Sequence, residues 1–309
     1  MKSQWIIVFI VCCLIAVLCQ DMAYARNTGT NPAALMHERY QSVRMALKSN
    51  PFGQPLHLVS SREADHTAAQ LSAVLDHPFD TFAEAFKTAD NWCELMMLHL
   101  NIKYCDAEEK GPNHLLTVFV GRKHEQPLES AYRGEYDYRL VAAGPDYLQI
   151  SIGADKGPFQ TRNYQILLEA VPLDHDRTFI HFAYAYDFGV LARAAQSLYF
   201  RTVGRDKVGF TTIEDPNSGQ RIYIGGVRGA LERNIMRYYL ALQAYLNGFS
   251  EPSAQRLEKR LLEWFALTER YPLQLREIGR NDYLHMKRQE FERQQSGAES
   301  LSPAGAVIW

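Results

Sequence analysis

The chain has 309 residues, of which 47% are hydrophobic and 22% are charged, and its formal net charge is -2 at pH 7. This composition is typical of a globular protein and excludes the strongly basic character of a nucleic-acid-binding domain. The length allows one large domain, or one domain with added segments. We therefore expect a folded protein that does not bind nucleic acid.

The N-terminus has the pattern of a secretory signal peptide. Lys2 precedes an apolar stretch from Trp5 to Leu18, and Ala23-Tyr24-Ala25 supplies a small-x-small cleavage site. The stretch is shorter than the roughly 20 residues of a membrane-spanning helix. We predict cleavage after Ala25, which leaves a secreted, periplasmic chain without a transmembrane segment. An uncleaved anchor is the alternative.

The cysteines divide between the predicted signal peptide and the rest of the chain. Three of the five lie within residues 1–25, so only Cys93 and Cys105 remain after cleavage. An even pair in an oxidising compartment predicts a disulfide, and two buried free thiols are the alternative. A metal site is disfavoured because Cys93, His99 and Cys105 lack a zinc-site spacing. We predict no metal and no cofactor.

The first elements expected after the signal peptide are a helix and two strands. Residues 32–48 have apolar side chains at helical spacing. A short strand is predicted at 56–60, a polar loop at 61–66, and a second strand at 68–75, where apolar and polar residues alternate.

Two short helices are expected next. Asp76-His77-Pro78-Phe79 ends the preceding strand. Thr81, with Glu84 three residues later, then forms a capping box that begins a helix. A second helix is predicted from Asn91 to about His99.

From residue 115 the hydrophobic period changes to two, which is typical of strands. Strands are predicted at 115–121, 131–142, 146–152, 160–171 and 178–187. Gly144-Pro145, Gly157-Pro158 and Asp174-His175-Asp176 supply the turns between them. Consecutive strands with short turns favour an antiparallel meander over a parallel sheet.

Two of these strands place tyrosines together on one face, because side chains two positions apart in a strand point the same way. The faces consist of Tyr132, Tyr136, Tyr138 and Leu140 in one strand, and Ile180, Phe182, Tyr184, Tyr186 and Phe188 in the other. A tyrosine-rich face is apolar but carries hydroxyls, which need hydrogen-bond partners when buried. We predict that an amphipathic molecule binds in a cavity lined by Tyr132, Tyr136, Tyr138, Tyr164, Tyr184 and Tyr186. A tyrosine-rich core is the alternative.

The remaining third of the chain is mostly helical. Residues 189–203 are expected to form a short amphipathic helix or lid, followed by short strands at 207–213 and 220–224. Gly225-Gly226 then leads into a long helix over about 227–247, which Gly248 ends. Two further amphipathic helices are predicted at 253–270 and 272–295, before a mobile tail.

This order of elements resembles START-type, helix-grip proteins. The segment Ala73-Val74-Leu75-Asp76-His77-Pro78-Phe79-Asp80-Thr81-Phe82, followed by Trp92, resembles the opening of that superfamily, in which a strand ends near a proline and a helix with a buried aromatic follows. The helix at 227–247 is similar to the C-terminal helix that such proteins grip in a curved antiparallel sheet. The resemblance covers about residues 67–247.

The resemblance implies an α+β helix-grip fold that binds lipids, sterols, polyketides or other apolar molecules between sheet and helix; some members are cyclases or hydrolases. It carries over no catalytic residue. We divide the chain into a signal peptide (1–25), an N-terminal helical extension (26–66), a START-like helix-grip domain (67–248), a C-terminal helical extension (249–295) and a tail (296–309).

Several polar residues are candidate ligand contacts. Asn234 falls on the apolar stripe of the long helix, where its amide would bond a ligand, or else a sheet carbonyl or tyrosine hydroxyl. Arg228 lies near the N-terminus of that helix, which favours an anionic head group; a solvated arginine is the alternative. His99, Asn101 and Lys103 share a face if their segment is extended. We expect them to be exposed, and a polar pocket is the alternative.

The leading functional hypothesis is a periplasmic protein that binds or carries a hydrophobic or amphipathic small molecule between the tyrosine face and the long helix. An enzyme acting on a lipid or polyketide-like substrate is one alternative, although the sequence has no Gly-x-Ser-x-Gly turn and we assign no catalytic residue. Another is an envelope interaction module, which an exposed apolar patch over Leu257, Leu261, Trp264 and Phe265 would favour. Peripheral contact with a membrane or an envelope protein is left open.

Overall fold

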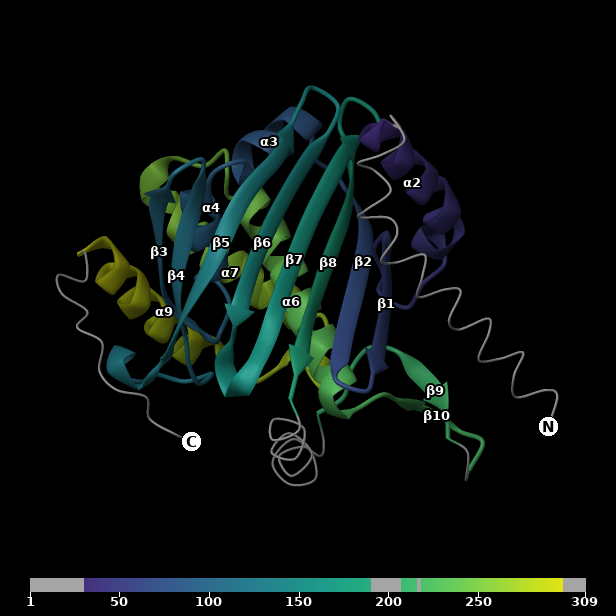
Figure 1. Cartoon of the computed structure of the whole chain (residues 1–309). Helices are drawn as coiled ribbons and strands as arrows, with labels where there is room; N and C mark the ends of the chain where they lie inside the picture. The colour runs from purple at the N-terminus through teal and green to yellow at the C-terminus, as the bar shows by residue number, and fades with distance from the viewer. Residues whose placement is uncertain (1–30, 190–206, 216–217, 297–309) are drawn as a thin grey trace.

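The computed structural model describes residues 31–189, 207–215 and 218–296, and one antiparallel sheet forms its centre (Figure 1). The eight strands follow the order β1-β2-β8-β7-β6-β5-β4-β3. Their bounds are β1 (Leu56–Glu63), β2 (His66–Leu75), β3 (Ile102–Lys110), β4 (Asn113–Val120), β5 (Tyr132–Ala143), β6 (Leu148–Lys156), β7 (Thr161–Pro172) and β8 (Thr178–Phe188). The last strand returns to pair with β2, with Phe182 opposite Leu71. The signal peptide, the lid beyond Gly189 and the tail beyond Ser296 lie outside the described residues.

Helices cover both faces of the sheet (Figure 1). They are α2 (Pro32–Lys48), α3 (Phe79–Phe86), α4 (Ala89–Met96), α6 (Gly226–Asn247), α7 (Ser253–Thr268), α8 (Pro272–Leu275) and α9 (Arg280–Gln295). The long helix α6 packs in the main core with the inner face of the sheet, and α7 packs against α6. Helix α2 lies on the opposite, outer face, where Met36 packs in a separate cluster with Val171 and Phe179. The predicted α+β helix-grip architecture is confirmed.

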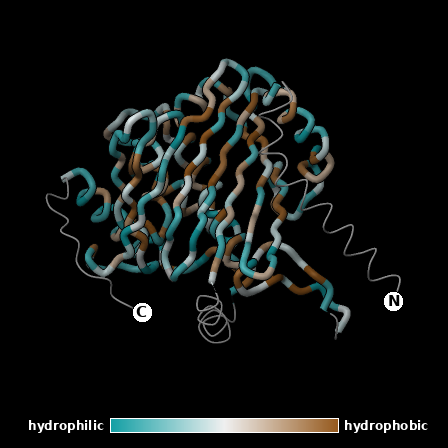
Figure 2. Tube along the Cα trace, viewed as in Figure 1, coloured by the Kyte–Doolittle hydropathy of each residue, from teal (hydrophilic) through white to brown (hydrophobic). Residues whose placement is uncertain are grey.

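Strand alternation determines which side chains enter the core. Figure 2 shows hydrophobic and hydrophilic residues alternating along the strands. In β8, Ile180, Phe182 and Phe188 are buried on the inner face, as period-two spacing predicts. Phe179 and His181 are buried as well, because α2 covers the outer face there. The sheet is therefore enclosed on both sides near β8.

Glycines mark both ends of α6. Gly225 is its extended N-cap, Gly226 has a φ of 62°, and Gly248 caps the C-terminus. Between them, Leu231, Ile235 and other apolar residues are buried in the main core. Glycine tolerates a positive φ without steric penalty, so the predicted start and end of this helix are confirmed.

Several boundaries differ from the sequence expectations. Of the predicted loop at 61–66, only residues 64–65 are a turn, because β1 runs to Glu63 and β2 begins at His66 to form a hairpin. The sheet therefore begins at Leu56, within the predicted N-terminal extension. The first short helix begins at Phe79 after Pro78, so Thr81 is not its cap.

Three further differences from the sequence expectations lie near the sheet edge and the C-terminus. Strand β3 was not predicted; it is an edge strand whose outer half is polar. The strand expected over 207–213 is reduced to β9 (Thr212–Glu214), which pairs with β10 (Arg221–Tyr223) in a separate hairpin. The helix expected over 272–295 is interrupted between α8 and α9.

The predicted disulfide is confirmed. Cys93 of α4 is bonded to Cys105 of β3, with Cα atoms 5.1 Å apart. The bond ties the helical crossover to the edge strand that follows it. Within the described ranges, no group of three or more His, Cys, Asp or Glu side chains is placed to hold a metal ion.

The C-terminal helices belong to the same core as the sheet. Leu261 and Trp264 of α7 are buried, and the Trp264 indole donates to the Arg237 carbonyl of α6 at 3.1 Å. The Trp264 ring stacks on Tyr283 of α9, with centroids 5.0 Å apart. None of the helices in the described segments is both long enough and apolar enough to cross a membrane.

His181 makes stability depend on pH. Burial beneath α2, with a smaller contribution from Arg39, lowers the pKa of His181 to about 3. Only the unfolded chain binds a proton as the pH falls below about 6.5, so this stabilisation is present above that pH and is lost below it. Between about pH 7.5 and about pH 5, we expect His181 to reduce the free energy of unfolding by about 2 kcal/mol.

Urea unfolding at the two pH values measures this loss. The variant His181→Gln should lose less stability on acidification than the wild type. The control His175→Gln, at an exposed turn residue, should keep the wild-type dependence. Equal acid sensitivity in wild type and His181→Gln would contradict the assignment.

Candidate ligand-binding site

Five aromatic rings meet between the inner face of the sheet and α6. This tyrosine cluster consists of Tyr136, Tyr164, Tyr184, Tyr186 and Tyr238. Tyr164 stacks on Tyr186 with centroids 5.1 Å apart, and its ring centroid lies 6.1 Å from that of Tyr136. Tyr238 of α6 contacts Tyr184 edge to face at 6.4 Å. The cluster lies where β5 and β7 begin and β8 ends.

A bulge in β7 brings Tyr164 into the cluster. The pairing of β7 with β8 shifts register between Arg162 and Gln165, and Asn163 has a φ of 52°. The extra residue increases the local twist and redirects the side chain that follows. Gly157 leaves room for that side chain, because a Cβ there would lie 2.1 Å from a Tyr164 ring carbon.

The cluster combines apolar rings with accessible hydroxyls. Its four sheet tyrosines keep between 7% and 9% of their surface exposed, and Tyr238 is partly buried. Tyr164 shares a 2.8 Å hydrogen bond with Thr161. Within the described part of the chain, no hydrogen bond is found for the hydroxyls of Tyr136, Tyr186 or Tyr238. Such groups remain available to water or to a ligand.

Burial keeps these phenols protonated. It raises the pKa of Tyr164 to about 12, although hydrogen bonds from Thr161 and Tyr184 oppose the shift. Burial and then the neighbouring tyrosines raise the pKa of Tyr136 and of Tyr184 well above 10. At neutral pH the cluster therefore presents neutral hydroxyls, each able to donate one hydrogen bond.

Two of the six predicted wall tyrosines lie elsewhere. Tyr132 is at the rim and 37% exposed. Tyr138 is buried further along β5, where its hydroxyl donates to the Phe86 carbonyl at 3.3 Å. Sequence reasoning missed Tyr238 as a site residue, although it follows Asn234 by one helical turn.

The two residues predicted as polar ligand contacts differ in the hydrogen bonds that they make within the protein. Asn234 is partly buried on α6, and no hydrogen bond to it is found in the described residues. Arg228 donates from Nε to Ser60 Oγ at 2.7 Å. Ser60 in turn donates to the buried Glu232 carboxylate. Arg228 is thus tied into a protein network, whereas Asn234 is not.

His99 lies against the tyrosine cluster and is not exposed. Its ring stacks on Tyr238 with centroids 4.8 Å apart, and only 2% of the residue is accessible. Nδ1 accepts from the Asn101 amide at 3.1 Å, whereas Nε2 is buried without a partner in the described residues. Lys103 is also buried, so the expected exposure of this trio was wrong. Burial, then Arg237 and nearby lysines, lower the His99 pKa well below 6.5.

The hydrogen bond to Nδ1 determines the tautomer of His99. A neutral imidazole that accepts at Nδ1 carries its proton on Nε2. His99 therefore presents a neutral N–H donor and not a basic lone pair. This arrangement suits ligand binding better than general-base catalysis.

Next to His99, three cations surround one carboxylate. We call Arg237, Lys123 and Lys207, together with Glu277, the cation cluster. Glu277 Oε1 accepts from Lys123 at 2.5 Å and from Arg237 at 2.9 Å, and its Oε2 accepts from Lys207 at 2.9 Å. Burial raises the Glu277 pKa, but attraction to Lys123 and Arg237 outweighs burial and lowers it to about 2.

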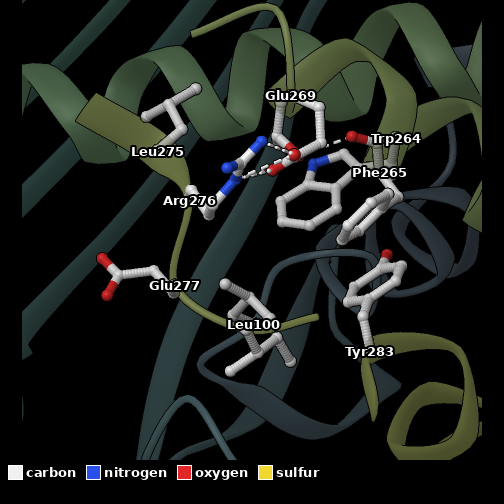
Figure 3. Close-up of a pocket in the computed structure, with 10 residues that line it drawn as sticks. Leu100, Trp264, Phe265, Glu269, Leu275, Arg276, Glu277 and Tyr283 are labelled. Atoms are coloured by element: carbon white, nitrogen blue, oxygen red, sulfur yellow. Dashed lines mark hydrogen bonds and ion pairs between the residues drawn. The ribbon is translucent and has the colours of Figure 1, made fainter. Parts of the chain in front are cut away.

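Two hollows border these clusters, since Glu277 lines the first and Tyr164 lines the second. One lies among α7, α8 and α9, where Trp264, Phe265 and Tyr283 face it and Arg276 pairs with Glu269 (Figure 3). Its volume is about 10 Å³, room for no more than about one water molecule. The other, of about 260 Å³, is an open polar depression around the β7 bulge. Neither has the enclosed apolar lining expected for a lipid-like molecule.

No protein-family model and no curated protein matches this sequence. Among solved structures, norcoclaurine synthase from Thalictrum flavum matches with 12% identity and a TM-score of 0.34, over 45% of this chain and 86% of that one. Human StAR-related lipid transfer protein 5 matches with 10% identity and a TM-score of 0.30, over 55% and 89%. An aromatase/cyclase from a Streptomyces species matches with 10% identity and a TM-score of 0.30, over 48% and 86%. These are similarities to solved structures, and at this level they assign the chain no superfamily, ligand or activity.

Proposed function

We propose that this protein binds an amphipathic small molecule between α6 and the tyrosine cluster, and that it does so as a secreted, periplasmic protein. The observation that carries the proposal is the cluster itself, in which packed apolar rings adjoin the hydroxyls of Tyr136, Tyr186 and Tyr238, for which the described residues supply no hydrogen-bond partner. Apolar surface buried on binding contributes about 25 cal/mol per Å², and a few polar groups orient the molecule. Asn234 and Tyr238 would contact it from the helix.

Two observations favour binding over the other readings. His99 has the shifted pKa that an enzyme would require, but its tautomer makes Nε2 a donor. For an interaction module we sought an exposed apolar patch on α7. Leu261 and Trp264 are buried there, and Leu257 and Phe265 are partly buried against the core.

The test is native mass spectrometry of the full-length precursor, exported to a bacterial periplasm and purified without detergent. We expect a small-molecule adduct that organic solvent extracts. The double variant Tyr136→Trp/Tyr184→Trp fills the space between rings and should reduce the adduct by about tenfold, the equivalent of about 1.4 kcal/mol. Circular dichroism verifies that the variant folds.

The matched control is Tyr223→Trp, at an exposed position of the β9–β10 hairpin. It should carry the adduct at the wild-type level. Equal adduct in wild type and the double variant would contradict the tyrosine site. A bare protein, still bare after incubation with phosphatidylethanolamine–phosphatidylglycerol vesicles, would contradict binding altogether.

A further inference from the structure

The cation cluster holds more positive charge than its carboxylate neutralises. Glu277 forms ion pairs with all three cations, and its single negative charge leaves a net charge of +2 among these four side chains. Arg237 and Glu277 are buried, with side chains 2% and 9% exposed, whereas the side chains of Lys123 and Lys207 are 29% and 33% exposed. Unbalanced charge in a buried position is unfavourable unless another group compensates it. Burial, then repulsion from Arg237, lower the Lys123 pKa to about 8.

Two buried N–H groups beside this charge have no acceptor in the described residues. They are Arg237 Nε and His99 Nε2. An unsatisfied buried donor is unfavourable and uncommon in native proteins, and Arg237 is the charged group that acts most strongly on His99. An anion would accept from both donors and would also balance the charge.

A neighbouring pair of lysines shows what a buried cationic site looks like when the protein supplies hydrogen-bond acceptors for its ammonium groups. Lys103 Nζ donates to Glu290 at 2.9 Å and to the Leu100 carbonyl at 3.0 Å. Lys287 Nζ donates to Glu290 at 2.7 Å and to the carbonyls of His99 at 2.6 Å and Ile102 at 2.8 Å. These ammonium groups use the protein's own acceptors. In the cation cluster, Arg237 and Lys207 reach longer backbone contacts, to the carbonyls of Leu275 at 3.3 Å and Arg276 at 3.5 Å, and they share one carboxylate with Lys123.

The unsatisfied donors adjoin the tyrosine cluster. His99 stacks on Tyr238, which in turn contacts Tyr184. A molecule lying along the tyrosines would therefore have one end at His99 and Arg237. We propose that this end is an oxyanion, a carboxylate or a phosphate, bound by the cation cluster and by His99 Nε2–H. The inference rests on the proposed function and specifies its ligand as an anionic amphiphile.

Calorimetric titration of the full chain, after solvent extraction and refolding, tests the inference with dodecanoate, dodecyl phosphate, dodecanol and inorganic phosphate. We expect one or both anionic amphiphiles to bind at least about tenfold more tightly than dodecanol. Comparison of the two amphiphiles distinguishes a carboxylate from a phosphate head group. Lys123→Gln/Lys207→Gln should remove that preference by weakening the binding of the anionic amphiphiles to the level of dodecanol.

Two further variants separate local effects from misfolding. His99→Phe keeps a stacked ring but removes the donor, and it should weaken anion binding about tenfold or more. Lys259→Gln removes an exposed lysine of α7 and should behave as wild type. Equal binding of dodecanol, dodecanoate and dodecyl phosphate would overturn the inference while the proposed function stands. If no amphiphile bound, both the inference and the proposed function would be contradicted. If only inorganic phosphate bound, the proposal that the ligand is an amphiphile would be contradicted.

Discussion

The substitution Glu290→Ala is expected to lower the free energy of unfolding by about 3–5 kcal/mol. Glu290 is the shared carboxylate of two fully buried lysines, Lys103 and Lys287. Its removal leaves two ammonium groups without a counter-charge where water cannot solvate them. Burial already lowers the pKa of Lys287 to about 8 against the attraction of Glu290. Equilibrium urea unfolding at neutral pH measures the loss.

Two comparisons identify the cause of that loss. Glu258 of α7 pairs with Arg288 of α9, but both side chains are about half exposed, so Glu258→Ala should cost no more than about 1 kcal/mol. The triple variant Lys103→Met/Lys287→Met/Glu290→Met replaces all charges by apolar groups and should remain close to the wild type. A loss below about 1 kcal/mol in Glu290→Ala would show that the lysines do not depend on this carboxylate.

The sequence predicted the elements whose signal is local. Period-two alternation gave the strands from residue 115 onward, and short turns gave their antiparallel order. Gly225-Gly226 and Gly248 marked the long helix, because these positions require or favour glycine. The disulfide followed from having two cysteines left after the predicted signal peptide. Each inference used residues close together in the chain.

The elements that were missed depend on distant partners. Strand β3 carries Lys103, which is buried only because Glu290 of α9 approaches it from far along the chain. A lysine in a polar segment gives no strand signal by itself. The hairpin at 61–66 also has polar side chains, and its strand character comes from backbone pairing with a neighbour.

The candidate site divides in the same way. Tyr136, Tyr184 and Tyr186 were predictable from alternation within single strands. Their meeting with Tyr238 was not, because α6 contributes that ring from another part of the chain. The cation cluster draws on a turn, a connecting segment, a helix and the break between α8 and α9. These residues share no periodic pattern in the sequence, so only the folded structure shows that their charges lie close together.

A second large effect on the free energy of unfolding is expected at Glu232. This residue of α6 forms hydrogen bonds with the segment that precedes β9. The carboxylate is fully buried and accepts from the amides of Phe210 at 2.6 Å and Thr211 at 2.9 Å. It also accepts from the Thr211 and Ser60 hydroxyls. The backbones cross closely here, since a Cβ on Gly209 would lie 2.9 Å from Gly229 Cα. No water-sized acceptor can easily replace the carboxylate at such a crossing.

Glu232→Ala should therefore cost about 3–5 kcal/mol, because two buried amides lose their acceptor at about 1–3 kcal/mol each. Hydrogen exchange at Phe210 and Thr211 should accelerate with the loss of stability. Glu232→Gln keeps one oxygen that both amides can share, and the hydroxyls can rotate to accept from its NH₂, so it should cost only about 1 kcal/mol. Glu214→Ala, exposed on β9, serves as the control. Equal losses in the Ala and Gln variants would mean that the negative charge, and not the hydrogen-bond geometry, holds this crossing together.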